Sequence, residues 1–161
     1  GIEDDLRLTL VGDGPQLAEA KHLVKQLGLS GEVEFTGNCS TVAQQLSRAD
    51  LFILLSDWEG FPISVLEARR ADLPVIASNV PGLRDAVRDG ETGMLFPFGD
   101  ERELSRLVTR MLRDDSWREE LAGNALHIHG IGHGHAVGRA RPGPRSDADL
   151  VGRQQRRERK R

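Results

Sequence analysis

The sequence contains little cysteine, no tyrosine and no long apolar run. Cys39 is the single cysteine in 161 residues, so no disulfide can form within the chain, and this usage is typical of a reducing compartment. No apolar run approaches the roughly 20 residues of a membrane-spanning helix, and no signal peptide opens the sequence. For these 161 residues, a disulfide-stabilised scaffold and a membrane-spanning protein are excluded, and we expect a cytoplasmic location.

Charge and aromatic content divide the chain near residue 125. Residues 1–125 carry 13 Lys and Arg against 22 Asp and Glu, whereas residues 126–161 carry 9 against 3, so the formal net charge of −3 conceals an acidic part and a basic part. All Phe and Trp residues lie in the first part. We therefore predict a folded domain over residues 1–125 and a disordered tail rich in Gly, His and Arg over residues 126–161.

The tail has two features that suggest a function. Four histidines suggest a metal site, but their spacing fits no helix face and the surrounding glycines supply no rigid frame, so no metal site is predicted. These histidines are His127, His129, His133 and His135. The basic end, residues 153–161, has no aromatic residue on which a base could stack, so no nucleic-acid partner is predicted.

Short apolar runs alternate along residues 6–125 with segments that have the three-and-four spacing of amphipathic helices. This alternation indicates βαβ units and a parallel sheet, and right-handed crossovers then place helices on both faces. The predicted fold is therefore α/β with a Rossmann-like parallel sheet of about five strands. Predicted strands are residues 6–11, 33–37, 51–55, 73–78 and 94–96, and predicted helices begin near residues 15, 42, 63, 83, 104 and 117. Pro15 is expected at the first position of its helix.

The most distinctive stretch joins a strand to a helix through a loop. The apolar run Leu51–Leu55 is expected to form a strand buried on both faces. A turn that contains Gly60 and Pro62 follows, and a helix is predicted from Ile63. Because ligands of open α/β sheets bind at the carboxyl ends of strands, we expect a ligand site in this stretch.

Two carboxylates lie in the same stretch, Glu59 in the loop and Glu67 in the helix. Ser64 and Glu67 also have the spacing of a capping box with Ser64 at the N-cap, so the pair has a structural interpretation beside the ligand-binding one. Glu59 by itself fits a solvated loop charge, and Trp58 either packs on the loop or covers a bound ligand. The residues alone leave these alternatives open.

Six sequence blocks in a fixed order extend this stretch into a family resemblance. The central block is the pair Glu59 and Glu67 with seven residues between them. The others are Gly12-Asp13-Gly14-Pro15, Val33-x-Phe35-x-Gly37, Ala49-Asp50-Leu51-Phe52, Pro74-Val75-Ile76-Ala77-Ser78 and Gly90-x-Thr92-Gly93. With these blocks the sequence resembles, over about residues 6–125, the family 4 glycosyltransferases (glycosyl transferases group 1). The resemblance is specifically to the C-terminal, donor-binding domain of their two-domain GT-B fold.

The resemblance implies retaining transfer of a sugar from a UDP-, GDP- or ADP-sugar, without a metal ion or other cofactor. It implies that Glu59 faces the sugar as the catalytic residue and that Glu67 binds the ribose diol. Amides at the start of the helix, with the positive end of its dipole, would hold the diphosphate, and these are the amides of Ile63, Ser64 and Val65. The further donor-binding residues that the resemblance implies are Gly12, Gly14, Phe35, Gly37, Gly60, Phe61, Pro62, Ile63, Ser64, Val65 and Thr92.

The chain departs from the family pattern at both ends. The acceptor-binding N-terminal domain is not found in the sequence, nor are the first strand and helix of the donor domain with their basic diphosphate-binding residues, so we interpret the chain as a fragment. The loss of pattern after residue 125 suggests a shift of reading frame or a chimeric gene end. We predict a donor domain that is inactive alone. In the complete enzyme it would meet an acceptor saccharide or lipid-linked acceptor, which is compatible with peripheral membrane association. The alternatives are a non-catalytic nucleotide-sugar-binding fragment and a Rossmann-like interaction domain without a ligand.

Overall fold

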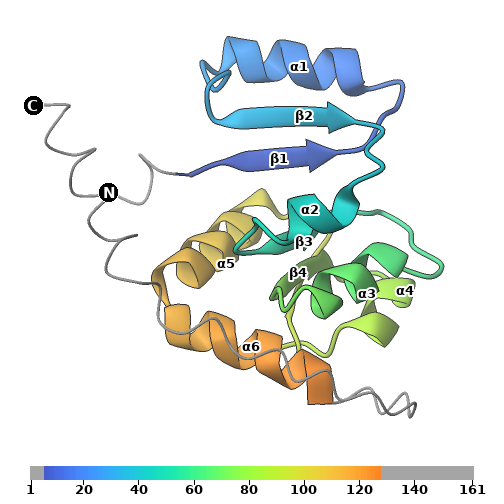
Figure 1. Ribbon diagram of the computed structural model, residues 1–161, viewed down its shortest axis with the longest axis vertical. Helices are drawn as coiled ribbons and strands as arrows, with labels where there is room; N and C mark the ends of the chain where they lie inside the picture. The colour runs from blue at the N-terminus through green and yellow to red at the C-terminus, as the bar shows by residue number, and fades with distance from the viewer. Residues whose placement is uncertain (1–5, 128–161) are drawn as a thin grey trace, which may run out of the picture. The chain divides into compact units, whose positions relative to one another are not determined.

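The computed structural model describes residues 6–127, in which strands and helices alternate until two helices end the fold (Figure 1). The strands are β1 (Leu8–Val11), β2 (Val33–Gly37), β3 (Phe52–Leu54), β4 (Val75–Ser78) and β5 (Met94–Phe96). The helices are α1 (Leu17–Gln26), α2 (Val42–Leu46), α3 (Ile63–Arg70), α4 (Pro81–Ala86), α5 (Glu101–Arg113) and α6 (Asp115–His127). The predicted α/β class is confirmed. Beyond the end of α6, the predicted tail lies outside the described residues.

All strand pairs among residues 6–127 are parallel, but they form two sheets instead of the single predicted one. β1 pairs with β2, with Leu8 opposite Val33, and the second sheet has the order β3-β4-β5, with Ile53 opposite Ile76. A doubly wound sheet has two flanks, one on each side of its central strand. The pair β1-β2 has the strand order of one flank, and β3-β4-β5 has the strand order of the other. β1 and β3 are therefore both edge strands in the described part of the chain.

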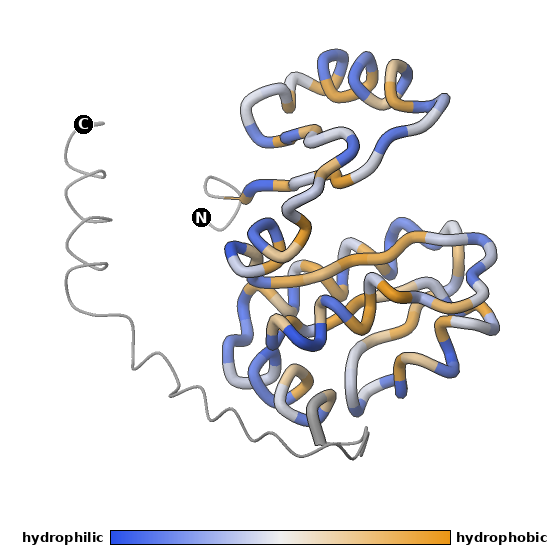
Figure 2. Tube along the Cα trace, turned by 45° about the vertical axis from the view of Figure 1, so that its right-hand side comes forward, coloured by the Kyte–Doolittle hydropathy of each residue, from blue (hydrophilic) through white to orange (hydrophobic). Residues whose placement is uncertain are grey.

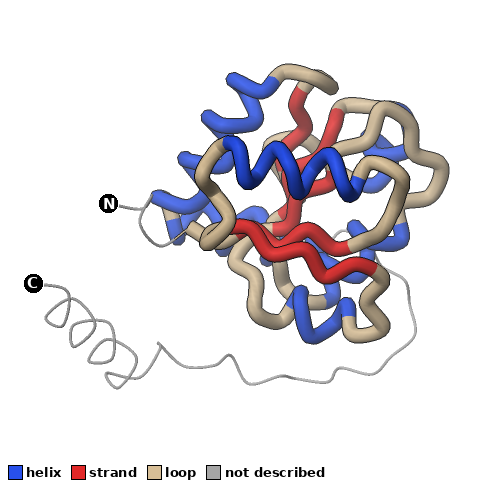
Figure 3. Tube along the Cα trace, turned by 90° about the horizontal axis from the view of Figure 1, so that it is seen from above, coloured by secondary structure: helices blue, strands red, loops and turns tan. Residues whose placement is uncertain are grey.

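The side chains of the three-stranded sheet alternate between two hydrophobic clusters, one on each face. Figure 2 colours hydrophobic residues orange and shows long orange stretches in the lower part of the trace. In β4, Val75 and Ala77 belong to the first cluster and Ile76 to the second. Helices α2, α3 and α4 contribute Leu46, Val65, Ala68 and Leu83 to the first cluster. Helices α5 and α6 contribute Leu107, Met111 and Leu121 to the second. Figure 3 shows the helices (blue) lying around the strands (red). The prediction of helices on both faces is thus confirmed for this sheet, and each large buried side chain contributes about 1.5–3 kcal/mol.

The edge strands β1 and β3 are less buried than their apolar sequences predict. The three residues of β3 were predicted to be buried on both faces, but each is only half-buried. Each of the four residues of β1 is exposed, with Leu8 at 43% and Val11 at 46%, and α1 has no buried residue. An apolar sequence predicts a strand correctly, but burial also depends on which strands and helices lie beside it.

Carboxylates determine where the last two helices begin. The side chain of Asp100 accepts a hydrogen bond of 3.0 Å from Glu103 N, so α5 starts three residues before the predicted Leu104. Asp114 accepts an equivalent bond of 3.0 Å from Trp117 N at the start of α6. The prediction that Pro15 opens the first helix is wrong, because α1 begins at Leu17. Within residues 6–127, no helix combines the length and apolar character needed to cross a lipid bilayer.

Candidate functional site

The loops that leave the carboxyl ends of β3, β4 and β5 are tied together. Ser56 N, just after β3, donates a 3.0 Å hydrogen bond to Ser78 Oγ at the end of β4. Asn79 N, just after β4, donates a 2.7 Å bond to Phe96 O at the end of β5. The loop with Glu59 therefore starts from a hydrogen-bonded edge of the sheet, where open α/β sheets bind their ligands.

Helix α3 begins at this edge without a side-chain cap. Pro62 occupies the N-cap and Ser64 is the second helical residue, so the capping-box interpretation of Ser64 and Glu67 is wrong. Of the three amides expected to bind a diphosphate, Ile63 N donates to Phe61 O at 2.9 Å and Val65 N donates to Pro62 O at 3.0 Å. Within residues 6–127 the structure gives Ser64 N no acceptor. The structure thus leaves Ser64 N as the free donor of this set.

The two glutamates flank this helix start and differ in exposure. Glu59 is half-buried in the loop, whereas Glu67 is exposed on α3. Within residues 6–127, no ion pair or side-chain hydrogen bond engages either carboxylate. Both carboxylates are therefore available to a ligand.

The other predicted residues of this stretch divide into exposed and buried groups. Phe61 and Ile63 are exposed at 72% and 62%, and Gly60 is exposed beside them. Pro62 and Val65 are buried, so Val65 offers a ligand its backbone and not its side chain. Trp58, 75% exposed, lies over Gly60, with Cη2 3.2 Å from the position of a Cβ at that glycine. Its ring therefore rests on the loop and is open to solvent.

The predicted residues in the first sheet form a second group. Gly12 and Gly37 meet at the carboxyl ends of β1 and β2, where Gly12 N donates a 3.1 Å bond to Gly37 O. Both have positive φ, +136° and +62°, which explains the glycines at these positions. Gly14 follows in the exposed turn before α1. Phe35 lies in β2 with Lys21 Nζ of α1 5.8 Å from its ring centroid, so its ring is directed toward that helix.

Thr92 is buried, and its side chain forms hydrogen bonds inside the fold. Its side chain is 1% exposed, and its Oγ1 accepts hydrogen bonds from Arg88 N at 2.9 Å and from Arg69 Nη2 at 3.1 Å. The donor contact expected of Thr92 stays a prediction, and within residues 6–127 its hydroxyl is already hydrogen-bonded inside the fold. The structure uses the threonine to hold the turn after α4 against α3.

Arg69 of α3 is a buried cation that the sequence did not indicate. It is 5% exposed, and its Nη2 also donates to Ala86 O at the end of α4. Nε and Nη1 have no partner among the described residues, and burial lowers the pKa of the guanidinium from its ordinary value. The structure therefore retains a desolvated charge that is only partly compensated.

Replacing this cation with an apolar side chain of similar length should not destabilise the domain. We expect Arg69→Met to be at least as stable as the parent, by up to about 3 kcal/mol, because two buried donors without partners are removed. Arg69→Ala is expected to be less stable than Arg69→Met because it leaves a cavity. Urea unfolding of both variants measures the difference. A loss above about 1 kcal/mol in Arg69→Met would show that the bonds to Ala86 and Thr92 dominate.

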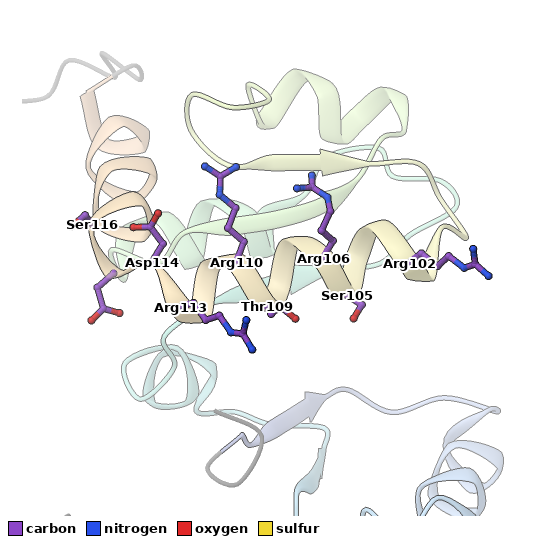
Figure 4. Close-up of a pocket in the computed structure, with 9 residues that line it drawn as sticks. Arg102, Ser105, Arg106, Thr109, Arg110, Arg113, Asp114 and Ser116 are labelled. Atoms are coloured by element: carbon purple, nitrogen blue, oxygen red, sulfur yellow. The ribbon is translucent and has the colours of Figure 1, made fainter. Parts of the chain in front are cut away.

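A shallow depression along α5 is lined by arginines and by none of the predicted site residues (Figure 4). Three of these arginines recur every fourth residue, and this spacing predicts that they lie on one face of the helix. They are Arg102, Arg106 and Arg110. Glu103 accepts two bonds from Arg106, at 2.7 and 2.6 Å, which lowers the pKa of that carboxyl. Arg110 stacks on Trp117, with 3.9 Å from Cζ to the ring centroid. With Asp114 and Asp115 also lining it, the depression has mixed charge and does not form a distinct anion site.

One further contact, made by Gly82, was not predicted from the sequence, in which Val80-Pro81-Gly82 is typical only of a turn. In the structure Gly82, in the first turn of α4, packs against the backbone of Glu59 and Gly60. A glycine after Val80-Pro81 was the available signal, but its partner lies in a loop more than 20 residues away. No local pattern identifies such a contact.

Comparison with known proteins agrees with this arrangement. The family model of glycosyl transferases group 1 matches residues 2–127. N-acetyl-alpha-D-glucosaminyl L-malate synthase of Bacillus anthracis is 34% identical over 123 residues, which are 76% of this chain and 32% of the relative. The chain spans about a third or less of the length of the first curated relatives that it matches.

Solved structures agree in fold. The structure of Anabaena Alr3699/HepE in complex with UDP-glucose superposes with a TM-score of 0.70 at 29% identity, covering 74% of this chain and 34% of that one. The C-terminal domain of a glycosyl transferase group 1 family protein (LpcC) from Francisella tularensis has a TM-score of 0.68 at 24% identity, covering 76% of this chain and 67% of that one. Because the family model matches most of the sequence and the fold is that of GT-B glycosyltransferases, this chain belongs to the glycosyl transferases group 1.

Proposed function

We propose that this chain is the donor-binding domain of a retaining glycosyltransferase and binds a UDP-, GDP- or ADP-sugar at the carboxyl ends of β3 and β4. The observation that carries the proposal is the start of α3, where a helix without a side-chain cap lies beside the carboxylates of Glu59 and Glu67, neither of which is paired within residues 6–127. The structure of the similar protein Alr3699/HepE in complex with UDP-glucose supports the proposal that the ligand is a nucleotide sugar.

Each group at this helix start has chemistry suited to one part of the donor. Ser64 N and the positive end of the α3 dipole would hold the diphosphate. The exposed Glu67 would accept two hydrogen bonds from the ribose diol. Glu59 would face the sugar, with Gly60 allowing close approach of the backbone. In this proposal no metal ion bridges the diphosphate.

The complete enzyme would add what this chain does not supply. An N-terminal domain would bind a saccharide or lipid-linked acceptor, close the second wall of the cleft and exclude water, which this domain alone does not do. A further strand would pair with the free edges of β1 and β3. We therefore propose that the isolated chain binds donor but does not transfer sugar, and that the enzyme acts in the cytoplasm.

Titration of the purified chain with UDP-glucose, GDP-mannose and ADP-glucose by isothermal calorimetry tests the proposal. We expect one nucleotide to be preferred, with a dissociation constant of about 0.1–5 mM, because an open half-site buries little of its ligand. Incubation with the preferred donor and simple sugars should give no transfer. Absence of binding for all three at several millimolar would instead support the interaction domain without a ligand.

A further inference from the structure

We propose that Gly82 is a positioning residue for Glu59, an inference that rests on the function proposed above. A Cβ at Gly82 would lie 2.0 Å from Glu59 O, 2.7 Å from Glu59 C and 2.9 Å from Gly60 O. All three are backbone atoms, which cannot rotate away as the end of a flexible side chain would. Gly82 therefore sets how closely the loop with Glu59 approaches α4.

The loop, and not α4, must yield if this space is filled. α4 is held from both sides of Gly82, because Val80 is 7% exposed and Leu83 is fully buried in the first cluster. The loop is held at its ends, by the bond from Ser56 and by the buried Pro62, but its middle is largely exposed. Restoring even a tight 3.0 Å contact requires the backbone at Glu59 to move by at least about 1 Å.

Such a shift would move the part of the proposed site that faces the sugar and leave the part that binds the ribose in place. Glu59 would move with the loop, whereas Glu67 is carried by α3, whose Val65 and Ala68 anchor it in the core. A displacement of about 1 Å of a group near the reacting atoms can cost about 100-fold in rate. Gly82 should therefore affect recognition of the sugar and leave recognition of the nucleotide nearly unchanged.

Gly82→Ala tests this, with Gly123→Ala as its matched control. Both glycines are helical, so both variants gain the same intrinsic helix propensity, but a Cβ at Gly123 meets nothing within 4 Å. Labelling with 5-fluorotryptophan gives resonances for Trp58 and Trp117, the two tryptophans of the chain. Trp58 reports on the loop, because its ring lies over Gly60, and Trp117 reports on the packing of α6.

In Gly82→Ala we expect the Trp58 resonance to shift and the Trp117 resonance to stay. The affinity for UDP-glucose should fall about tenfold or more, while the affinity for UDP changes by less than about twofold. Gly123→Ala should match the parent in all four readings. Equal losses for UDP and UDP-glucose, or an unmoved Trp58 resonance, would overturn the role of Gly82.

A measurement on the parent chain covers the case in which Gly82→Ala does not fold. The amide resonance of Gly82 should move on addition of UDP-glucose and not on addition of UDP, because the loop that it touches faces the sugar. An unmoved amide with both ligands, in a chain that binds both, would overturn the inference alone. Where the calorimetric titration selects GDP or ADP, that nucleoside diphosphate and its sugar replace UDP and UDP-glucose in these measurements. A parent that binds none of the three nucleotide sugars overturns the proposed function, and with it the role of Gly82 in that function.

Discussion

Glu67→Ala should weaken donor binding by about 10- to 100-fold without unfolding the domain. A carboxylate that accepts hydrogen bonds from two hydroxyl groups contributes about 1.5–3 kcal/mol for the pair, and each 1.4 kcal/mol is tenfold in affinity. Because Glu67 is exposed and has no ion pair within residues 6–127, its removal leaves no buried group without a partner. Calorimetric titration with the preferred nucleotide sugar measures the loss.

Two further variants make this result specific. Glu120→Ala removes another exposed helical carboxylate, on α6, and should leave donor affinity unchanged. Glu67→Gln keeps one acceptor oxygen and should lie between the parent and Glu67→Ala. If Glu120→Ala weakens binding as much as Glu67→Ala, the effect arises from net charge, and the ribose role of Glu67 is wrong.

Leu107→Ala should lower the free energy of unfolding by about 2–5 kcal/mol, which is a large share of the about 5–15 kcal/mol available to a domain. Leu107 is fully buried on α5, in the cluster that covers the second face of the β3–β5 sheet. Its truncation removes apolar contacts and leaves a cavity between α5 and β4. Urea unfolding, followed by circular dichroism, measures the change.

Leu23→Ala is the matched control for this prediction. Leu23 lies on α1 and is 52% exposed, so its truncation creates no cavity and should change stability by less than about 0.5 kcal/mol. A loss in Leu23→Ala equal to that in Leu107→Ala would mean that α1 is covered in solution by a part of the protein outside residues 6–127. That result would contradict the exposure of α1 described above.

The central stretch shows how far local patterns reach. The apolar run before Ser56 and the helical spacing after Pro62 predicted a strand, a loop and a helix, and all three are present at nearly the predicted residues. The same patterns did not predict the burial of β3, because that depends on neighbouring strands. They predicted the helix start at Ile63 correctly, but the alternative in which Ser64 is the N-cap is wrong, because Pro62 occupies that position.

The candidate site shows the same division. Glu59 and Glu67 were identified from their spacing and from the blocks around them, and in the described part of the chain neither carboxylate has an ion pair or a side-chain hydrogen bond. Thr92 belonged to one of the blocks, but the structure buries its hydroxyl against Arg69, a residue with no signal in the sequence. The backbone amide of Ser64 differs from those of Ile63 and Val65 because it has no acceptor within residues 6–127. A sequence pattern does not show which amides are hydrogen-bonded.

By itself, the sequence determined the alternation of strands and helices, the family and the pair of glutamates, because apolar periodicity, turn residues and motif spacing are local properties. The tertiary structure decided that the strands form two sheets, that Arg69 and Thr92 are bonded in the interior, and that Gly82 limits the position of the Glu59 loop. Each of these depends on the approach of atoms from segments distant in the chain. That approach is set by packing of the whole domain and not by any one stretch of residues.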